Sequence, residues 1–324
     1  MSKKRARLII NPKSGTRSKK GLENTVIKAL QPCGISVEVR VTKGAGDGFL
    51  LASEAVADKY DIVISAGGDG TVNEVANALS FSNCILGILP YGSGNGLARS
   101  IGVPQDIFGA LKLIEKGNVI HCDRGLVNGH PFYCTFGVGF DAAVSEKFAS
   151  MKRRGKGTYL RSAFQEFFNY QSESYAIKIN DKIIAEKALL IAVCNAPQYG
   201  NNAYIGPKAK LTDGLLDVTV VHADNSFHTL LLGMDMLTGM IDKNRRIGTL
   251  RVPQLTIVRL KDGCVHLDGE PMNMGKVLSI ICQDKALKIF APSKQEEFVP
   301  FISPLRAILN DLRYDVMDKF RKLN

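Results

Sequence analysis

The sequence has 324 residues, of which 45% are hydrophobic and 23% are charged. This length is generous for one domain and suits two, and the composition is that of an ordinary globular protein. No apolar run approaches the roughly 18 residues that a membrane span needs, and the run Leu8–Ile10 is too short for a signal peptide. The seven cysteines show no paired spacing, which excludes a disulfide framework and a cysteine metal site and indicates a reducing, cytoplasmic setting.

Basic residues outnumber acidic ones and give a formal net charge of +11. Residues 1–20 hold eight Lys or Arg and no acid, and Lys152, Arg153, Arg154 and Lys156 form a second cluster. Such clusters suit nucleotide phosphates or an anionic membrane surface, although a solvated basic face is an equally good interpretation. Nucleic acid is not expected as a partner, because the chain shows no recognition module and no interleaving of aromatic with basic residues.

The first third of the chain alternates short apolar strands with helical patterns. The strands are predicted at residues 6–10, 36–41, 62–65 and 85–89, and the helices at residues 18–31, 47–58, 72–79 and 107–115. This alternation predicts an α/β domain with a parallel sheet and right-handed connections. The helix that follows the third strand is expected to start near Thr71.

Three loops rich in glycine and small polar residues follow the first, third and fourth predicted strands. They are Asn11–Gly15, Gly67–Gly70 and Gly92–Gly96. Because parallel strands end at one edge of their sheet, we expect these loops to converge there, where open α/β sheets bind ligands. Glycines let backbone N–H groups approach phosphate oxygens, and Asp69 is then expected to meet a cation or a hydroxyl. The first loop lacks the spacing of a P-loop.

From residue 119 onward the pattern changes to strands joined by tight turns, beginning with a hairpin at Asn128–Gly129. Strands are predicted at residues 119–127, 131–136, 175–179, 183–194, 215–221, 250–260, 264–267, 277–282 and 286–290, and helices at 142–168 and 227–241. This half therefore reads as an antiparallel β-sandwich. We place the domains at residues 1–118 and 119–292; the helical tail, 293–324, packs on the first domain or lies on a membrane, and packing is the commoner fate.

Four motifs occur in a specific order along the chain. They are Asn11-Pro12-Lys13-Ser14-Gly15, Gly67-Gly68-Asp69-Gly70-Thr71, Gly92-Ser93-Gly94-Asn95 and Leu267-Asp268-Gly269-Glu270. Together with Gly137–Asp141 and Asp213–Asp217, they resemble the diacylglycerol kinase catalytic-domain family, which includes bacterial lipid kinases, sphingosine kinases and ceramide kinases, over essentially the whole chain. The resemblance implies an N-terminal ATP-binding domain like that of NAD kinases and 6-phosphofructokinases, a β-rich C-terminal lipid domain, and an active site in the cleft between them.

The resemblance also implies which residues hold ATP. They are Asn11, Thr42, Gly67, Gly68, Asp69, Gly70, Thr71, Val72, Asn73, Gly92, Ser93 and Gly94. The glycine loops fit this role on chemical grounds as well, through backbone N–H donors and helix N-termini. Thr42 is implied by the resemblance alone, because a Thr before Lys-Gly is more often only the end of a strand.

Acidic residues are implied to carry the phosphoryl transfer. Glu270 resembles the general base that takes the proton of the lipid hydroxyl, and Asp268 would position it. Asp69 would hold Mg²⁺ or the acceptor hydroxyl; in some members of the family the matching aspartate is described as the base, so the identity of the base stays open. On chemistry alone, Asp268-Gly269 could be an ordinary turn, and Asp69 could cap the helix that follows it.

Two further sites are implied in the second half. Asp213, with backbone oxygens of Lys210 and Leu215, would bind another Mg²⁺, although a β-turn before a strand accounts for these residues equally well. Asp141 would bind the substrate head group, as in sphingosine kinases. The cluster Lys152–Arg154 receives no specific role.

The expected function is ATP-dependent phosphorylation of a membrane lipid, with diacylglycerol converted to phosphatidic acid. The loop Gly92–Gly96 is closer to those of sphingosine and ceramide kinases, so a sphingoid base or ceramide is an alternative acceptor. Two alternatives come from other classes. An NAD kinase shares the Gly-Gly-Asp-Gly loop but does not require the motif Leu267–Glu270, and a non-catalytic nucleotide- or lipid-binding protein would not require the acidic residues of these motifs. We expect a cytoplasmic protein that associates peripherally with the inner face of the membrane and that could form a homodimer.

Overall fold

The computed structural model describes residues 4–15, 17–150, 170–222, 226–244, 247–294 and 298–321. The chain divides into two compact units. Unit 1 comprises residues 1–122, 285–297 and 309–324, and unit 2 comprises residues 123–284 and 298–308. The chain therefore returns to unit 1 after it has built unit 2, and residues 285–292, which we assigned to the second domain, belong to unit 1.

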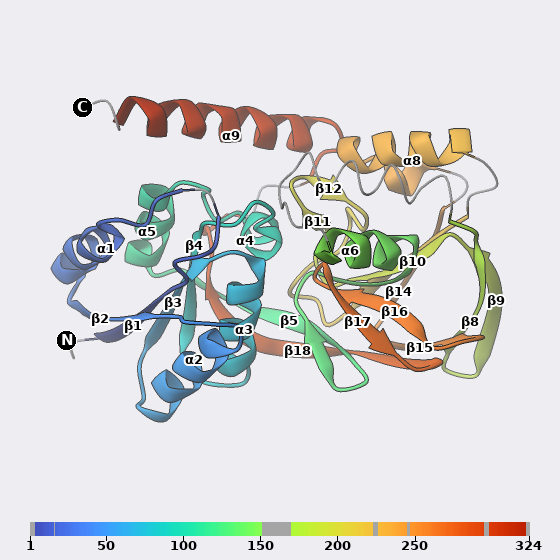
Figure 1. The fold of residues 1–324 in the computed structure, drawn as a ribbon, viewed down its shortest axis with the longest axis horizontal. Coiled ribbons are helices and arrows are strands. Elements are labelled where there is room, and N and C mark those ends of the chain that lie inside the picture. The colour runs from blue at the N-terminus through green and yellow to red at the C-terminus, as the bar shows by residue number, and fades with distance from the viewer. Residues whose placement is uncertain are drawn as a thin grey trace. The chain divides into compact units, whose positions relative to one another are not determined.

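Unit 1 is built on a parallel sheet (Figure 1). Its strands are β1 (Lys4–Ile10), β2 (Ile35–Val41), β3 (Ile62–Gly67), β4 (Ile85–Pro90) and the end of β18 (Val277–Phe290). They lie in the order β2-β1-β3-β4-β18, and each neighbouring pair is parallel. Strands β3 and β4 are almost wholly buried and apolar, because helices cover both faces of the sheet. The predicted parallel α/β domain is confirmed.

The helices of unit 1 lie on both faces of this sheet. They are α1 (Leu22–Leu30), the 3₁₀ turn η1 (Gln31–Cys33), α2 (Asp47–Ala57), α3 (Asp69–Leu79), α4 (Gly96–Ile101) and α5 (Ile107–Lys116). Figure 1 shows α1 with α5 on one face and α2 with α3 on the other. Helix α3, expected to start near Thr71, begins two residues earlier at Asp69. Helix α4 was not predicted, because the glycines around Asn95 read as a loop.

Unit 2 is a two-layered β-sandwich. One layer holds β5 (Val119–Val127), β6 (His130–Phe132), β8 (Glu173–Ile179), β9 (Lys182–Ala188), β15 (Gln254–Arg259) and the first part of β18. The other holds β14 (Ile247–Val252), β13 (Leu216–Val221), β10 (Leu190–Cys194), β7 (Thr135–Gly139), β16 (Gly263–Leu267) and β17 (Glu270–Met274), in that order. Added to these are the hairpin β11 (Gln198–Gly200) and β12 (Ala203–Tyr204), α6 (Phe140–Ser150), α8 (Ser226–Thr238) and η2 (Ile241–Lys243). Helix α9 (Ile302–Arg321) begins in unit 2, and its residues from 309 onward belong to unit 1.

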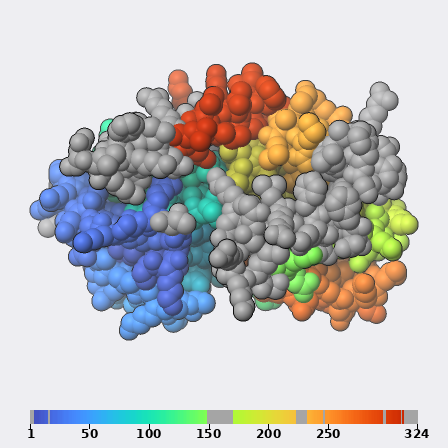
Figure 2. Space-filling model, turned by 45° about the horizontal axis from the view of Figure 1, so that its top comes forward, coloured from blue at the N-terminus to red at the C-terminus, as the bar shows by residue number. Residues whose placement is uncertain are grey.

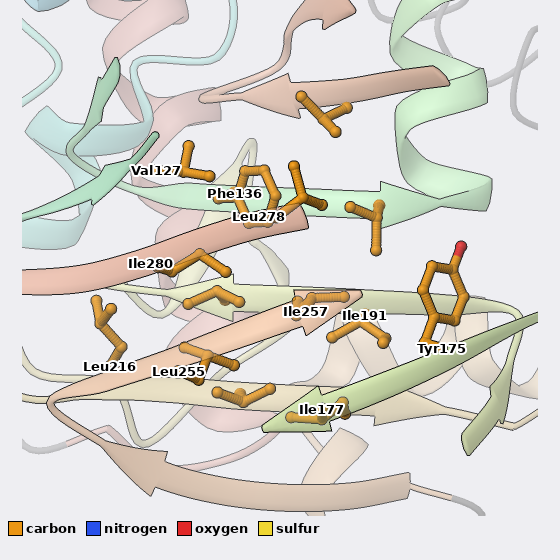
Figure 3. Packing of buried hydrophobic residues seen from close by; sticks show 14 of the residues in the cluster. Val127, Phe136, Tyr175, Ile177, Ile191, Leu216, Leu255, Ile257, Leu278 and Ile280 are labelled. Carbon is orange, nitrogen blue, oxygen red and sulfur yellow. The ribbon is translucent and has the colours of Figure 1, made fainter. Parts of the chain in front are cut away.

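The core of unit 2 lies between the two layers (Figure 3). Ile177, Ile257 and Leu278 belong to the first layer, and Phe136 and Ile191 belong to the second; all five are fully buried. Along β15 the buried and less buried positions alternate, as a sheet with one solvated face requires. The sequence prediction of a β-sandwich is therefore confirmed.

Several predicted strands have different limits in the structure. The hairpin at Asn128–Gly129 is present, and both residues have positive φ, as its tight turn needs. The predicted strands 183–194 and 250–260 are wrong as single strands, because each is split at Leu189 or at Pro253 and its two halves join opposite layers. Predicted strand 131–136 is split in the same way between β6 and β7, whereas 277–282 and 286–290 form the single strand β18. A hydrophobic pattern does not reveal where a chain crosses between layers, since inward-facing residues occur on both sides of the crossing.

Candidate active site

The strands of unit 1 end together at one edge of the sheet. Ile10, the last residue of β1, lies beside Val41 of β2 and Ala66 of β3, and Gly67 lies beside Pro90 of β4. The residues that leave these strands are joined by backbone hydrogen bonds: the N–H groups of Asn11, Thr42 and Tyr91 donate to the carbonyls of Ala66, Ile10 and Gly67 at 2.9–3.0 Å. The expected convergence of the three loops is thus present in the structure.

The loops touch backbone to backbone at their glycines. A Cβ added at Gly92 would lie 2.7 Å from the Cα of Gly68, and a Cβ at Gly68 would lie 3.3 Å from the Cα of Gly92. Gly15 has a φ of +68°, and its Cβ would lie 1.8 Å from the carbonyl oxygen of Tyr91. Gly92 and Gly15 leave no room for a side chain, and Gly68 leaves little. The glycines therefore serve the packing of the loops on one another as well as the exposure of backbone N–H groups.

The carboxylate of Asp69 joins two of these loops. It lies in the first turn of α3 and accepts hydrogen bonds from the N–H groups of Asn95 at 2.9 Å and Gly96 at 2.6 Å, at the start of α4. Burial raises the pKa of the Asp69 carboxyl, and the N–H groups of Gly96 and Asn95 oppose that rise by stabilising the charged form. The N-cap of α3 is Gly68, and the side chain of Asp69 binds its own N–H group as well as the start of the next helix.

The other residues predicted to hold ATP lie around this edge. Asn11 donates from Nδ2 to Oγ1 of Thr71 at 2.8 Å, which links the first loop to α3. Thr42 and Val72 are buried, Ser93 is exposed, and Gly70, Asn73 and Gly94 are partly buried. Val72 points into the core, so only its backbone is available to a ligand.

Two basic side chains at this edge were not found by sequence reasoning. Lys19 lies 4.5 Å from the centre of the Tyr91 ring and donates to the carbonyl of Ser14, and burial lowers the pKa of its ammonium group. Arg99 donates from Nε to the carbonyl of Gly94 at 2.9 Å and forms an ion pair with Asp311 of α9 at 2.9 Å. These contacts could not be predicted from the sequence, because they join segments that meet only in the fold.

The motif Leu267–Glu270 forms the turn between β16 and β17 in unit 2. Asp268 has a φ of +51°, and its carboxylate accepts hydrogen bonds from the N–H groups of Tyr133, Cys134 and Thr135 at 2.7–2.9 Å. Burial raises the pKa of the Asp268 carboxyl, and these three donors oppose that rise. Glu270 is exposed and is the first residue of β17, a strand that was not predicted. Asp268 thus fixes the turn that carries Glu270.

Asp141, predicted to bind a substrate head group, is buried in unit 2 beside a histidine. Its Oδ2 lies 3.1 Å from Nε2 of His266 and accepts from the hydroxyl of Tyr199 at 2.9 Å. The N–H of Gly269 donates to Nδ1 of His266 at 3.3 Å, so the ring proton is on Nε2 and points at Asp141. A Cβ at Gly137 would lie 2.1 Å from Asp141, so only glycine leaves space for this pair. His266 was missed because a lone His in a strand carries no signal.

The predicted metal site lies in the turn before β13. Asp213 accepts from the N–H of Leu215 at 3.2 Å and lies 3.5 Å from a guanidinium nitrogen of Arg251. Within the described ranges no three His, Cys, Asp or Glu side chains gather as a metal-binding group, and Mg²⁺ between Lys210 and Leu215 stays a prediction. The basic cluster at Lys152–Arg154 lies outside the described residues, as do residues 151–168 of the predicted helix.

Comparison with known proteins places the chain in a family. The diacylglycerol kinase catalytic domain matches residues 5–127, and the YegS C-terminal NAD kinase beta sandwich-like domain matches residues 134–291. The chain is 35% identical over 272 residues to a probable lipid kinase YegS-like of Pectobacterium atrosepticum, which spans 82% of this chain and 89% of that one. It is 29% identical over 300 residues to a diacylglycerol kinase of Staphylococcus aureus, over 90% and 93% of the two chains.

A solved structure agrees with these matches. A putative diacylglycerol kinase from Bacillus anthracis has a TM-score of 0.74 and 26% identity, over 90% of this chain and 99% of that chain. The chain therefore belongs to the lipid kinase family that is defined by the diacylglycerol kinase catalytic domain. It is an enzyme of the kinase class, with the α/β and β-sandwich domains that the motifs implied. In the part of the chain that the structure describes, no helix is both long and apolar enough to span a membrane.

Proposed function

We propose that this kinase transfers the γ-phosphoryl group of ATP to the hydroxyl of a membrane diacylglycerol. The observation that carries the proposal is the sheet edge where the three glycine loops meet: a Cβ at Gly92 would lie 2.7 Å from the Cα of Gly68, and a Cβ at Gly15 would lie 1.8 Å from the carbonyl oxygen of Tyr91. Such a surface offers N–H donors and the N-terminus of α3 to phosphate oxygens. The relative from Staphylococcus aureus, named a diacylglycerol kinase over nearly its full length, supports this choice of acceptor.

Asp69 fits the role of a ligand to nucleotide-bound Mg²⁺. Its oxygens accept the N–H groups of Asn95 and Gly96, and the two carboxylate oxygens together have room for a cation or a bound water as well. Mg²⁺ at the phosphates would neutralise charge that develops during transfer. Because the same carboxylate holds Asn95 and Gly96, replacement by Asn would also disturb the third loop. Loss of activity in Asp69→Asn would therefore report on loop structure as well as on the metal.

Glu270 is the residue that we propose as general base. It is exposed, whereas the oxygens of Asp268 accept the N–H groups of Tyr133, Cys134 and Thr135, and those of Asp69 accept the N–H groups of Asn95 and Gly96. Asp268 and Asp69 are thus engaged in holding a turn and two loops, whereas the hydroxyl of a substrate can reach an exposed carboxylate. We assign Asp268 to the positioning of Glu270 and Asp69 to the nucleotide side of the reaction.

Three other acceptors are to be compared with diacylglycerol. The loop Gly92–Gly96 favours trying a sphingoid base and ceramide, and the NAD kinase-like sandwich favours trying NAD. We also propose a cytoplasmic location with peripheral association to the membrane, because the basic residues outnumber the acidic ones by 42 to 31.

The test is a panel of acceptors incubated with the purified protein, Mg²⁺ and ATP labelled in its γ-phosphate. Separate reactions contain diacylglycerol, ceramide or sphingosine in mixed micelles, or NAD in solution. We expect label in phosphatidic acid at a rate well above that in the other products. Label in NAD alone would overturn the proposal, and label in ceramide or sphingosine alone would correct the lipid class.

A further inference from the structure

The C-terminal helix α9 presents an apolar face to solvent. Ile302, Leu305, Leu309 and Leu312 recur at three- and four-residue intervals, so they share one side of the helix. Leu305, Leu309 and Leu312 are 47%, 56% and 57% exposed, and the flanking Phe301, Ile302 and Ile308 are exposed to a similar degree. We expected packing as the commoner fate of this tail; among the side chains of α9 that the structure describes, these apolar ones are exposed.

Contacts on its other sides hold α9 in place and leave this face outward. At its N-terminal end, the Phe298 ring lies 4.6 Å from the Tyr204 ring, and the N–H of Phe301 donates to the carbonyl of Thr238. Pro304 is buried, and Asp311 pairs with Arg99 at 2.9 Å. The helix is therefore anchored through residues other than the exposed leucines.

The end of α8 extends the apolar surface. Met234 and Leu237 are 58% and 54% exposed, and Met240 just after the helix is partly exposed. Thr238, between them in sequence, accepts the hydrogen bond from Phe301, so the end of α8 adjoins the start of α9 within unit 2. Figure 2 shows the orange and red atoms of these two helices side by side on one face of the molecule. We call this surface, from Met234 to Met240 and Phe301 to Leu312, the α8–α9 patch.

We propose that the α8–α9 patch docks on an anionic lipid surface. The inference rests on the proposed function, since a diacylglycerol substrate lies in a bilayer that the enzyme has to reach. Large side chains such as Phe, Leu and Met on a surface helix are those that enter the boundary between head groups and acyl chains. The charges of the patch do not oppose docking: its two acids both have partners, Asp235 in Asn244 at 2.8 Å and Asp311 in Arg99 at 2.9 Å. Arg306 is exposed, and the chain as a whole carries +11.

The anchor of α9 also reaches the nucleotide edge. Asp311 lies between Leu309 and Leu312 in sequence, and its partner Arg99 donates to the carbonyl of Gly94. Contact of the leucine face with lipid would thus hold α9, whose Asp311 carboxylate binds Arg99. Because Arg99 also binds the loop Gly92–Gly96, its guanidinium connects the docking surface to the proposed nucleotide site.

The test compares three proteins on vesicles in the absence of ATP. They are the full-length wild type, the triple variant Leu305→Gln, Leu309→Gln, Leu312→Gln, and a control, Ile183→Gln, Leu260→Gln, Val277→Gln, which changes apolar residues outside the patch that are 55–79% exposed. Sedimentation with vesicles of phosphatidylcholine and phosphatidylglycerol measures binding at low salt and at about 0.5 M salt, where long-range attraction is screened. Melting temperature and mass in solution are recorded for each protein.

We expect the wild type and the control to bind, and the leucine variant to bind about 10-fold or more weakly, with the larger difference at high salt. Equal binding by all three proteins contradicts the proposal. A second outcome would also contradict it: the wild type is a dimer, and the leucine variant is a monomer that binds vesicles as well as the wild type does. In that case the patch joins two copies of the protein. If the wild type binds vesicles through the leucines but phosphorylates no lipid, the proposed function is wrong and the docking proposal still holds. As a control on activity, all three proteins should phosphorylate soluble, short-chain diacylglycerol at the same rate.

Discussion

In unit 2, Nε2 of His266 lies 3.1 Å from Oδ2 of Asp141, and both residues are buried. Asp141 comes from the start of α6, whereas His266 comes from β16, just before the turn that carries Glu270. The opposite ring nitrogen of His266 accepts the N–H of Gly269 within that turn. One imidazole thus connects the interior of the sandwich to the residue that we propose as the base.

Replacement of His266 by Ala should lower kcat by about 10- to 100-fold, because a small displacement of a catalytic group is enough for such a loss. The KM for ATP should stay unchanged, since the residues proposed to hold ATP belong to unit 1. His266→Gln keeps a donor toward Asp141 and should recover part of the activity. A rise in the KM for ATP with constant kcat would show that the role of His266 is not the positioning of Glu270.

Gly92→Ala should weaken ATP binding, because the new Cβ would lie 2.7 Å from both the Cα of Gly68 and Oδ1 of Asn95. The loops must then move apart, at a cost of about 1–3 kcal/mol in the free energy of unfolding. Gly248→Ala is the matched control, since the nearest atom to its Cβ is 3.8 Å away. Calorimetric titration with an ATP analogue measures the effect, and equal affinity in both variants would refute the role given to the Gly68–Gly92 contact.

Arg99→Ala should destabilise the third loop. The variant loses a hydrogen bond to Gly94 and leaves the carboxylate of Asp311 without this partner, which together cost about 1–3 kcal/mol. Arg40→Ala, which breaks a more exposed pair with Glu38, should cost less than about 1 kcal/mol. Urea unfolding gives both values. If the two variants are equally stable, Arg99 does not link α9 to the loop.

The rate at which iodoacetamide alkylates each cysteine should depend on the pKa of its thiol as well as on its exposure. Burial raises the pKa of the Cys264 thiol to about 11 and that of Cys282 to about 12. At pH 8 only about one thousandth of Cys264 is thiolate, the reactive form, so the exposed Cys33 should react first. The rate at Cys264 should rise about tenfold per pH unit up to about pH 10. Peptide mass spectrometry follows each site, and fast labelling of Cys264 at pH 8 would contradict the assignment.

The parts of the fold that could be predicted from sequence are those with local causes. Buried apolar runs predict β3 and β4, and a glycine cluster after each one predicts a loop at the sheet edge. The turn at Asn128–Gly129 is also local, because both residues tolerate positive φ.

The remaining parts depend on contacts between distant segments. Whether the chain crosses between layers at Leu189 and Pro253 depends on which layer has a neighbouring strand to pair with. Helix α4 forms where the carboxylate of Asp69 accepts the N–H groups of Asn95 and Gly96. The pairs His266–Asp141 and Arg99–Asp311 join residues more than a hundred positions apart, so no spacing in the sequence points to them.

The central claim is that the protein is a lipid kinase whose base is Glu270. The most direct measurement is the rate at which wild type and Glu270→Gln convert short-chain diacylglycerol and ATP to phosphatidic acid, with ATP affinity and melting temperature measured in parallel. We predict that the wild type forms product and that the variant is about 100-fold or more slower, with unchanged ATP affinity and stability, because Glu270 is exposed. No product from the wild type, or a variant that keeps more than about a tenth of the rate, would contradict the claim.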